Sequence, residues 1–140
     1  MNHVTPEVRK AIAELNAALA SALDHEEFER LRNVFQADVH YAAPDGEFTD
    51  LDSLITSFHA KAGSRSIRYV PGSMLLEARN DHTVIAVSTW HTFTGEAGTG
   101  ACLIADFLDL YLEQPDGDWL IAERVVQPAG QDPPPSVRGL

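Results

Sequence analysis

The spacing of apolar residues in the first part of the chain predicts helices. Pro6 suits the first position of a helix, and apolar residues recur every three or four positions behind it. This stripe consists of Val8, Ile12, Leu15, Leu19 and Leu23. Asp24 and Glu27 match a capping box, so a second helix is predicted to begin there. Asp50 can cap a third helix that ends near Gly63.

Alternating apolar and polar residues after residue 66 predict an antiparallel sheet. Long strands are expected at 67–79, 82–94, 100–113 and 118–127, and a short strand at 38–43 precedes the third helix. Turns are expected at residues 80–81, 95–100 and 115–117. Pro71 lies inside the first long strand, which indicates a sheet edge or a bulge there. Helices followed by a run of long strands indicate an α+β fold.

Residue parity in the second long strand separates a face of smaller residues from a bulky one. The first face carries Val84, Ala86, Ser88, Trp90 and Thr92, which suits a surface that helices cover around a cavity. The second face carries Ile85, Val87, Thr89, His91 and Phe93. Such a face would be a large apolar patch in solvent, so we expect it to form a homodimer interface. In the preceding strand Tyr69, Pro71, Ser73 and Leu75 share one parity.

Composition and charge narrow the class of protein. The 140 residues suit a single domain at 1–130, followed by a flexible Pro-rich tail at 131–140. A net charge of −11 disfavours nucleic acid and anionic membrane surfaces as partners. Cys102 is the only cysteine, which excludes an internal disulfide and a Cys-cluster zinc site. No leader or membrane-length apolar run is evident, so we expect a cytoplasmic protein without cofactor or metal.

Two segments resemble the SnoaL-like group of the nuclear-transport-factor-2-like superfamily, which includes polyketide cyclases, dehydratases and ketosteroid isomerases. One is the end of the first predicted helix, residues 19–24, and the other is the last hairpin strand, residues 116–126. The resemblance implies a cone-shaped α+β domain whose N-terminal helices pack on a strongly curved antiparallel sheet around one pocket. It also assigns the parity of Tyr69, Pro71, Ser73 and Leu75 to the cavity side and implies dimerisation through the outer side of the sheet.

Catalytic members of the resembled group usually pair an aspartate at the end of the first helix with a histidine on the first long strand. Asp24 matches the first position, whereas Tyr69 stands where the histidine is common, and Leu19 replaces a frequent tyrosine. A phenol with a pKa of about 10 donates a hydrogen bond at neutral pH, so Tyr69 would hold a substrate oxygen while Asp24 accepts a proton. Two structural interpretations compete with these roles. Asp24 would only cap the second helix, and Tyr69 would only be a half-buried strand aromatic.

His91 is the only histidine in the middle of a long strand, and a bulge would be needed to turn it toward the pocket as a catalytic group. Arg124 matches the arginine that ends the last strand in many family members. It could bind a ligand carboxylate or carbonyl, or it could pair with Glu123, Asp109 or Asp106. The residues predicted to bind substrate are Tyr41, Ser88, Trp90, Phe107, Asp109 and Arg124.

Three functions are consistent with this sequence. The first is a cofactor-free isomerase, dehydratase or cyclase that acts on a small apolar molecule of polyketide or steroid type. The second is a ligand-binding protein of the same fold without catalysis. The third is a subunit or interaction domain, like the small subunit of aromatic-ring dioxygenases. The first is the leading hypothesis, and the presence of Tyr69 in place of the family histidine supports the second.

Overall fold

The protein consists of an N-terminal helical segment and a six-stranded sheet, and the computed structural model describes residues 3–63, 67–94 and 102–129. The helical elements are α1 (Pro6–Asp24), the 3-10 helix η1 (Phe28–Asn33) and α2 (Leu51–Lys61). The strands are β1 (Phe35–Ala43), β2 (Gly46–Phe48), β3 (Ile67–Asn80), β4 (Thr83–Thr94), β5 (Cys102–Glu113) and β6 (Trp119–Pro128). The predicted loop at 95–100 and tail at 131–140 lie outside the described residues.

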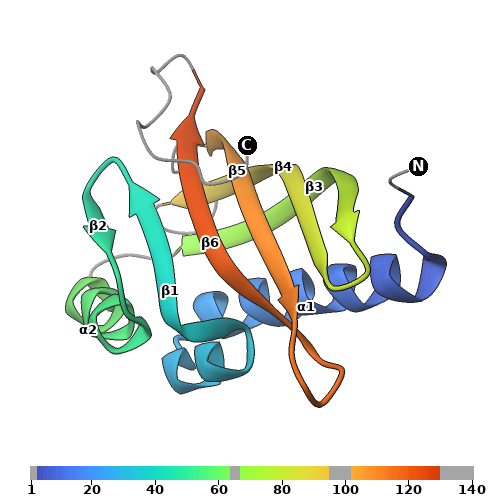
Figure 1. Ribbon diagram of the computed structural model, residues 1–140. Coiled ribbons are helices and arrows are strands. Elements are labelled where there is room, and N and C mark those ends of the chain that lie inside the picture. Colours follow the sequence, from blue (N-terminus) through green and yellow to red (C-terminus); the bar gives the residue numbers. More distant parts are fainter. Residues whose placement is uncertain (1–2, 64–66, 95–101, 130–140) are drawn as a thin grey trace.

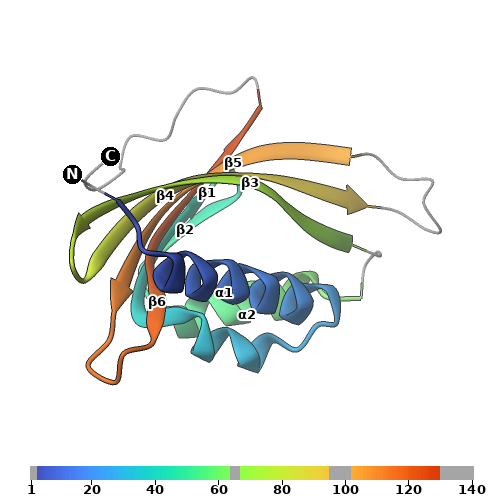
Figure 2. The ribbon, with the colours of Figure 1, turned by 90° about the vertical axis from the view of Figure 1, so that its right-hand side faces the viewer.

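The strand order is β2-β1-β6-β5-β4-β3, and all neighbouring strands are antiparallel except β1 and β6, which are parallel. The sheet is strongly curved and stays open, and α1 and α2 lie on its concave side (Figures 1 and 2). The core fills the space between these helices and the inner face of the sheet. This arrangement confirms the predicted α+β fold. None of the helices in the described ranges is both long and apolar enough to cross a membrane.

Helix α1 ends differently from the prediction. It begins as expected, with the Thr5 side chain accepting a hydrogen bond from the Val8 N–H. At its other end, the N–H groups of Glu26 and Glu27 bond to the carbonyls of Leu23 and Ala22, with Glu26 in a left-handed conformation at φ 57°. This is the Schellman motif that closes a helix. The predicted capping box at Asp24 and Glu27 is therefore wrong, since η1 follows without a side-chain cap.

Strand β3 is an edge strand and also carries a bulge, so both features that Pro71 indicated are present. Pro71 pairs with Trp90, but Met74 pairs with Ser88, which leaves one extra residue on β3. The extra residue reverses the side-chain parity. Tyr69 lies on the inner face as predicted, whereas Leu75, assigned to the same face, is 77% exposed on the outer face. The assignment of Leu75 and Ser73 to the cavity side was wrong for this reason.

The outer face of the sheet is apolar and open to solvent. Its exposed large residues are Val70, Leu75, Val87, Phe93 and Ile104, which register pairing places on one side of β3, β4 and β5. We call this set the outer apolar face. The pairing of β4 with β5 is continuous from Thr83 to Phe93, so no bulge turns His91 inward. The hypothesis that His91 faces the pocket is wrong, because its side chain shares the outer face with Val87.

Candidate functional site

A row of side chains from five different strands crosses the inner face of the sheet. Tyr41 on β1 is the register partner of Phe48 on β2 and of Arg124 on β6. Arg124 is in turn the partner of Asp109 on β5, and Asp109 is the partner of Ala86 on β4. Directly opposed residues share a face of the sheet, so segments far apart in the sequence supply one continuous row under α1.

The centre of this row is a buried ion pair. Arg124 Nε and Nη2 donate hydrogen bonds to the two Asp109 carboxylate oxygens at 2.7 and 2.8 Å, and both residues are at most 1% exposed. Of the alternatives predicted for Arg124, the pairing with Asp109 is therefore the one observed. Glu123 instead bonds to His40 at 2.7 Å, and Asp106 accepts a hydrogen bond from Thr89. Two such charges are tolerated in a core only when they satisfy each other with good geometry.

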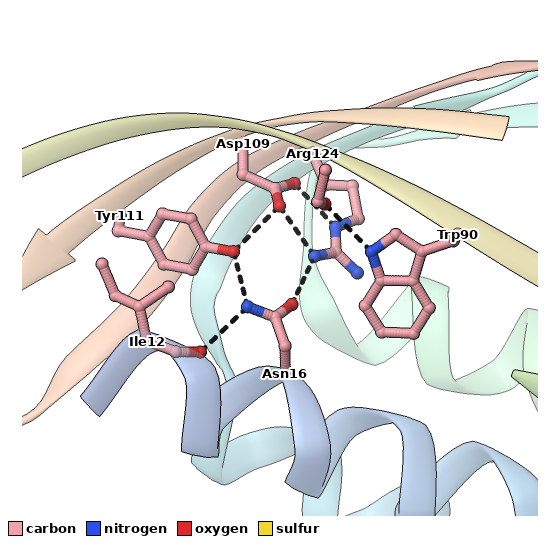
Figure 3. Close-up of polar contacts among 7 residues, drawn as sticks. Ile12, Asn16, Trp90, Asp109, Tyr111 and Arg124 are labelled. Carbon is pink, nitrogen blue, oxygen red and sulfur yellow. Dashed lines mark hydrogen bonds and ion pairs between the residues drawn. The ribbon is translucent and has the colours of Figure 1, made fainter. Parts of the chain in front are cut away.

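Asn16 and Tyr111 complete the polar network (Figure 3). The Tyr111 hydroxyl donates to Asp109 at 2.9 Å, and the Asn16 amide donates to this hydroxyl and to the Ile12 carbonyl. Arg124 Nη2 also donates to the Asn16 side-chain oxygen at 2.9 Å. Sequence reasoning missed Asn16, although it follows Ile12 by four residues and precedes Leu19 by three, and so lies on the apolar stripe of α1.

Two stacked aromatic rings flank the guanidinium. The rings of Trp90 and Phe107 are parallel within 15° with centroids 5.0 Å apart. The central carbon of Arg124 lies 4.6 Å from the Phe107 centroid and 5.3 Å from the Trp90 centroid. Both contacts fall within the range of cation–π attraction. The Trp90 indole N–H donates to the Ser88 hydroxyl at 3.0 Å. Five of the residues predicted to bind substrate therefore lie together here, and all are buried: Ser88, Trp90, Phe107, Asp109 and Arg124.

Burial and neighbouring charges hold these groups in defined protonation states. Burial lowers the pKa of Arg124, but the charge and hydrogen bonds of Asp109, together with the Tyr111 and Tyr41 phenols, raise it, and the net shift is upward. Burial raises the pKa of the Tyr111 phenol, and Asp109 raises it further. Burial also raises the pKa of the Tyr41 phenol, against the opposing charge of Arg124. At neutral pH the site therefore contains one cation and two protonated phenols that can donate.

Asp24 and Tyr69 are brought together at the end of α1. The Asp24 carboxylate accepts a hydrogen bond from the Tyr69 backbone N–H at 2.7 Å, and its other oxygen lies 3.6 Å from the Arg68 guanidinium. The Asp24 side chain is 13% exposed. The Tyr69 side chain packs against the core, and its phenol is close enough to Tyr41 to raise the Tyr41 pKa. Asp24 thus connects α1 to the start of β3, a contact that the helix-cap interpretation did not anticipate.

Aromatic side chains surround the Tyr41 end of the row. The Tyr41 ring makes edge contacts with Phe35, Phe48 and Phe58 at centroid distances of 6.0 to 6.5 Å. In the described ranges, no group of three or more histidine, cysteine, aspartate or glutamate side chains is placed to hold a metal ion. A depression of about 270 Å³ lies elsewhere, between the start of α1 and the β3–β4 turn, and contains none of the predicted site residues.

The profile of the SnoaL-like domain matches residues 5–125. The chain belongs to the SnoaL-like domain family. Its fold is similar to that of a Nostoc punctiforme protein of unknown function with a cystatin-like fold, with a TM-score of 0.80 and 20% identity over 99% of each chain. No curated protein matches the sequence.

Two further solved structures with this SnoaL-like fold come from Novosphingobium aromaticivorans. One is a candidate scytalone dehydratase, with a TM-score of 0.76 and 16% identity over 93% of this chain and 89% of that chain. The other is the β subunit of a candidate aromatic-ring-hydroxylating dioxygenase, with a TM-score of 0.73 and 16% identity over 88% of this chain and 90% of that chain. At these sequence identities, the comparison shows similarity of fold alone.

Proposed function

We propose that this protein binds a small, largely apolar molecule between its helices and its sheet and catalyses an isomerisation, dehydration or cyclisation of it by acid–base chemistry. The observation that carries the proposal is the position of Asp24. Its carboxylate accepts a hydrogen bond from the backbone N–H of Tyr69, whose side chain packs against the core on the inner face of the sheet. Membership of the SnoaL-like family and the likeness to a candidate scytalone dehydratase support this reaction type.

In this proposal the Asp24 carboxylate accepts a proton from the substrate carbon next to a carbonyl group. The backbone N–H of Tyr69 and the guanidinium of Arg68 orient the carboxylate. The Tyr69 phenol donates a hydrogen bond to the substrate oxygen that gains negative charge as the proton leaves. The proton then returns to another substrate atom or departs with a leaving hydroxyl as water, so the cycle needs no cofactor.

Proton abstraction, the first step that all three proposed reactions share, can be tested without knowing the natural substrate. We expect the protein to accelerate exchange of the C2 protons of α-tetralone, a small aromatic ketone, for deuterium in heavy water, followed by NMR. The Asp24→Asn variant should lower the protein-dependent rate by about 100-fold or more, because an amide oxygen still accepts the Tyr69 N–H but cannot take up a proton. Tyr69→Phe should lower the rate by a smaller factor, and Tyr69→His restores the usual family pair and should preserve or raise it.

Asp50→Asn is the matched control for this experiment. The Asp50 carboxylate also accepts a backbone N–H, that of Ser53, but caps α2 on the exposed surface. This variant should retain the full exchange rate. An exchange rate of Asp24→Asn equal to that of the wild-type protein would show that Asp24 is not the catalytic base. No exchange by the wild-type protein would contradict the catalytic proposal and favour the ligand-binding function.

Specific observations favour the two alternative functions. The presence of Tyr69 where catalytic relatives have a histidine favours a ligand-binding protein without catalysis. The outer apolar face, together with the likeness to a dioxygenase β subunit, favours a subunit function. A subunit of this kind should associate with a larger partner through the outer apolar face and show no exchange activity of its own.

A further inference from the structure

Two hydrogen-bond donors in the interior have no partner among the described residues. Arg124 uses Nε and Nη2 for Asp109 and Asn16, whereas its third nitrogen, Nη1, makes no hydrogen bond in the described ranges (Figure 3). The Tyr41 hydroxyl likewise has no hydrogen-bond partner within the described part of the chain. No side-chain nitrogen or oxygen in that part is both sealed from water and unpaired. Both donors therefore border space that a water-sized group can reach.

The two donors belong to neighbouring positions on the same face of the sheet. Tyr41 and Arg124 are register partners on the adjacent strands β1 and β6. Each also influences the pKa of the other, so the phenol and the guanidinium lie close to one another. Two neighbouring donors of this kind, fixed by strands and by the Asp109 pair, are suited to hold one acceptor oxygen.

The charge of the site determines which kind of ligand oxygen it can bind. The Asp109 carboxylate already neutralises Arg124, and no other cation contacts this pair among the described residues. A ligand carboxylate would put a second anion on one guanidinium in the interior, which is costly. A neutral carbonyl oxygen adds no net charge and still gains both hydrogen bonds.

The surroundings select the rest of the ligand. The Tyr41 ring contacts three phenylalanine rings, and Trp90 and Phe107 stack beside the guanidinium. A flat apolar body matches this environment. We infer that the Tyr41 hydroxyl and Arg124 Nη1 together bind the neutral carbonyl oxygen of an aromatic or cyclic ketone. This inference rests on the proposed binding of a small apolar molecule and names its chemical class.

NMR titration of the wild-type protein with acetophenone and benzoate tests the choice of oxygen. The Trp90 indole N–H, identified by comparison with a Trp119→Phe variant, reports binding beside the guanidinium. At pH 7.5 acetophenone should bind at least about 10-fold more tightly than benzoate, because only the carboxylate adds a charge. Tighter binding of benzoate, or no acetophenone binding up to its solubility limit, would overturn the inference.

The Tyr41→Phe variant tests the donor itself. Loss of one hydrogen bond should weaken acetophenone binding by about five-fold and leave binding of ethylbenzene, which lacks the oxygen, unchanged. Thr89→Val also removes one hydroxyl from a strand, but on the outer face of the sheet, where the Thr89 hydroxyl donates to Asp106, and it should leave acetophenone binding unaltered. Equal effects of Tyr41→Phe on both probes would contradict the assignment.

These results separate this inference from the proposed reaction. Asp24→Asn should abolish deuterium exchange but preserve acetophenone binding and its dependence on Tyr41. A Tyr41-dependent ketone site in a protein without exchange activity would refute the catalytic proposal alone. Exchange that depends on Asp24, in a protein for which Tyr41→Phe has no effect on ketone affinity, would refute the ketone site alone.

Discussion

At the scale of single residues, the central feature of the interior is the buried ion pair of Asp109 and Arg124. Asp109 and Arg124 are desolvated, and the pair is balanced by two hydrogen bonds between the charges and by bonds to Asn16 and Tyr111. A pair of this kind often adds little net stability compared with apolar residues of the same size, whereas removal of one partner leaves an uncompensated charge. The pair also fixes the orientation of the guanidinium, so that Asp109 and Asn16 engage Nε and Nη2 and leave Nη1 for the proposed ligand.

We expect Arg124→Met to lower the free energy of unfolding by about 3–5 kcal/mol, because the Asp109 carboxylate is then buried without its cation. The double variant Arg124→Met/Asp109→Leu should lose less stability than Arg124→Met alone, since no charge is left unpaired. Urea denaturation followed by circular dichroism measures the two single variants, Arg124→Met and Asp109→Leu, and the double variant. A double variant as unstable as the sum of the two single ones would show that the two residues do not act as a pair.

At the scale of elements, the sequence predicted most of the fold because helix and strand periodicity are local. The stripe from Val8 to Leu23 and the alternation from Ile67 onward define the helix and the strands within a few residues. Features that depend on backbone geometry were less accessible. The Asp24–Glu27 pattern looked like a helix start because the left-handed conformation of Glu26 has no sequence signal such as glycine. The β3 bulge likewise left only Pro71 as an indication.

The conformation of Glu26 predicts a stabilising substitution. A residue with a Cβ atom pays about 1–2 kcal/mol in the left-handed region, and glycine is the usual residue at this position of a Schellman motif. We expect Glu26→Gly to raise the free energy of unfolding by roughly 0.5–1 kcal/mol, after the entropic cost of glycine in the unfolded chain. Glu27→Gly, at a position with φ −93°, should lower it instead. Thermal and urea unfolding would reveal a wrong assignment if both variants shifted stability in the same direction.

At the scale of the whole molecule, the site is assembled from positions that only the tertiary fold brings together. Tyr41 and Arg124 are register partners although more than 80 residues separate them in the sequence, and Asp109 joins them from the neighbouring strand β5. Parity within the second long strand predicted that Trp90 faces inward, because alternation is a property of one strand. It did not predict that Arg124 pairs with Asp109 rather than with Glu123, since that depends on the register between strands and on Asn16 of α1.

The last prediction concerns assembly through the outer apolar face. Five large apolar residues are exposed together on β3, β4 and β5, and association would bury them. We expect a homodimer of twice 15.3 kDa at micromolar concentration, measured by light scattering. Ile104→Glu should shift it toward monomer, because a charge would be buried at the interface.

Leu103→Glu is the matched control for Ile104→Glu. Leu103 is the adjacent residue on the same strand and is 59% exposed, against 47% for Ile104, but has the opposite parity. Association that both variants disrupt equally would assign the interface to another surface, and a wild-type monomer would mean that the outer apolar face does not join two copies of this chain.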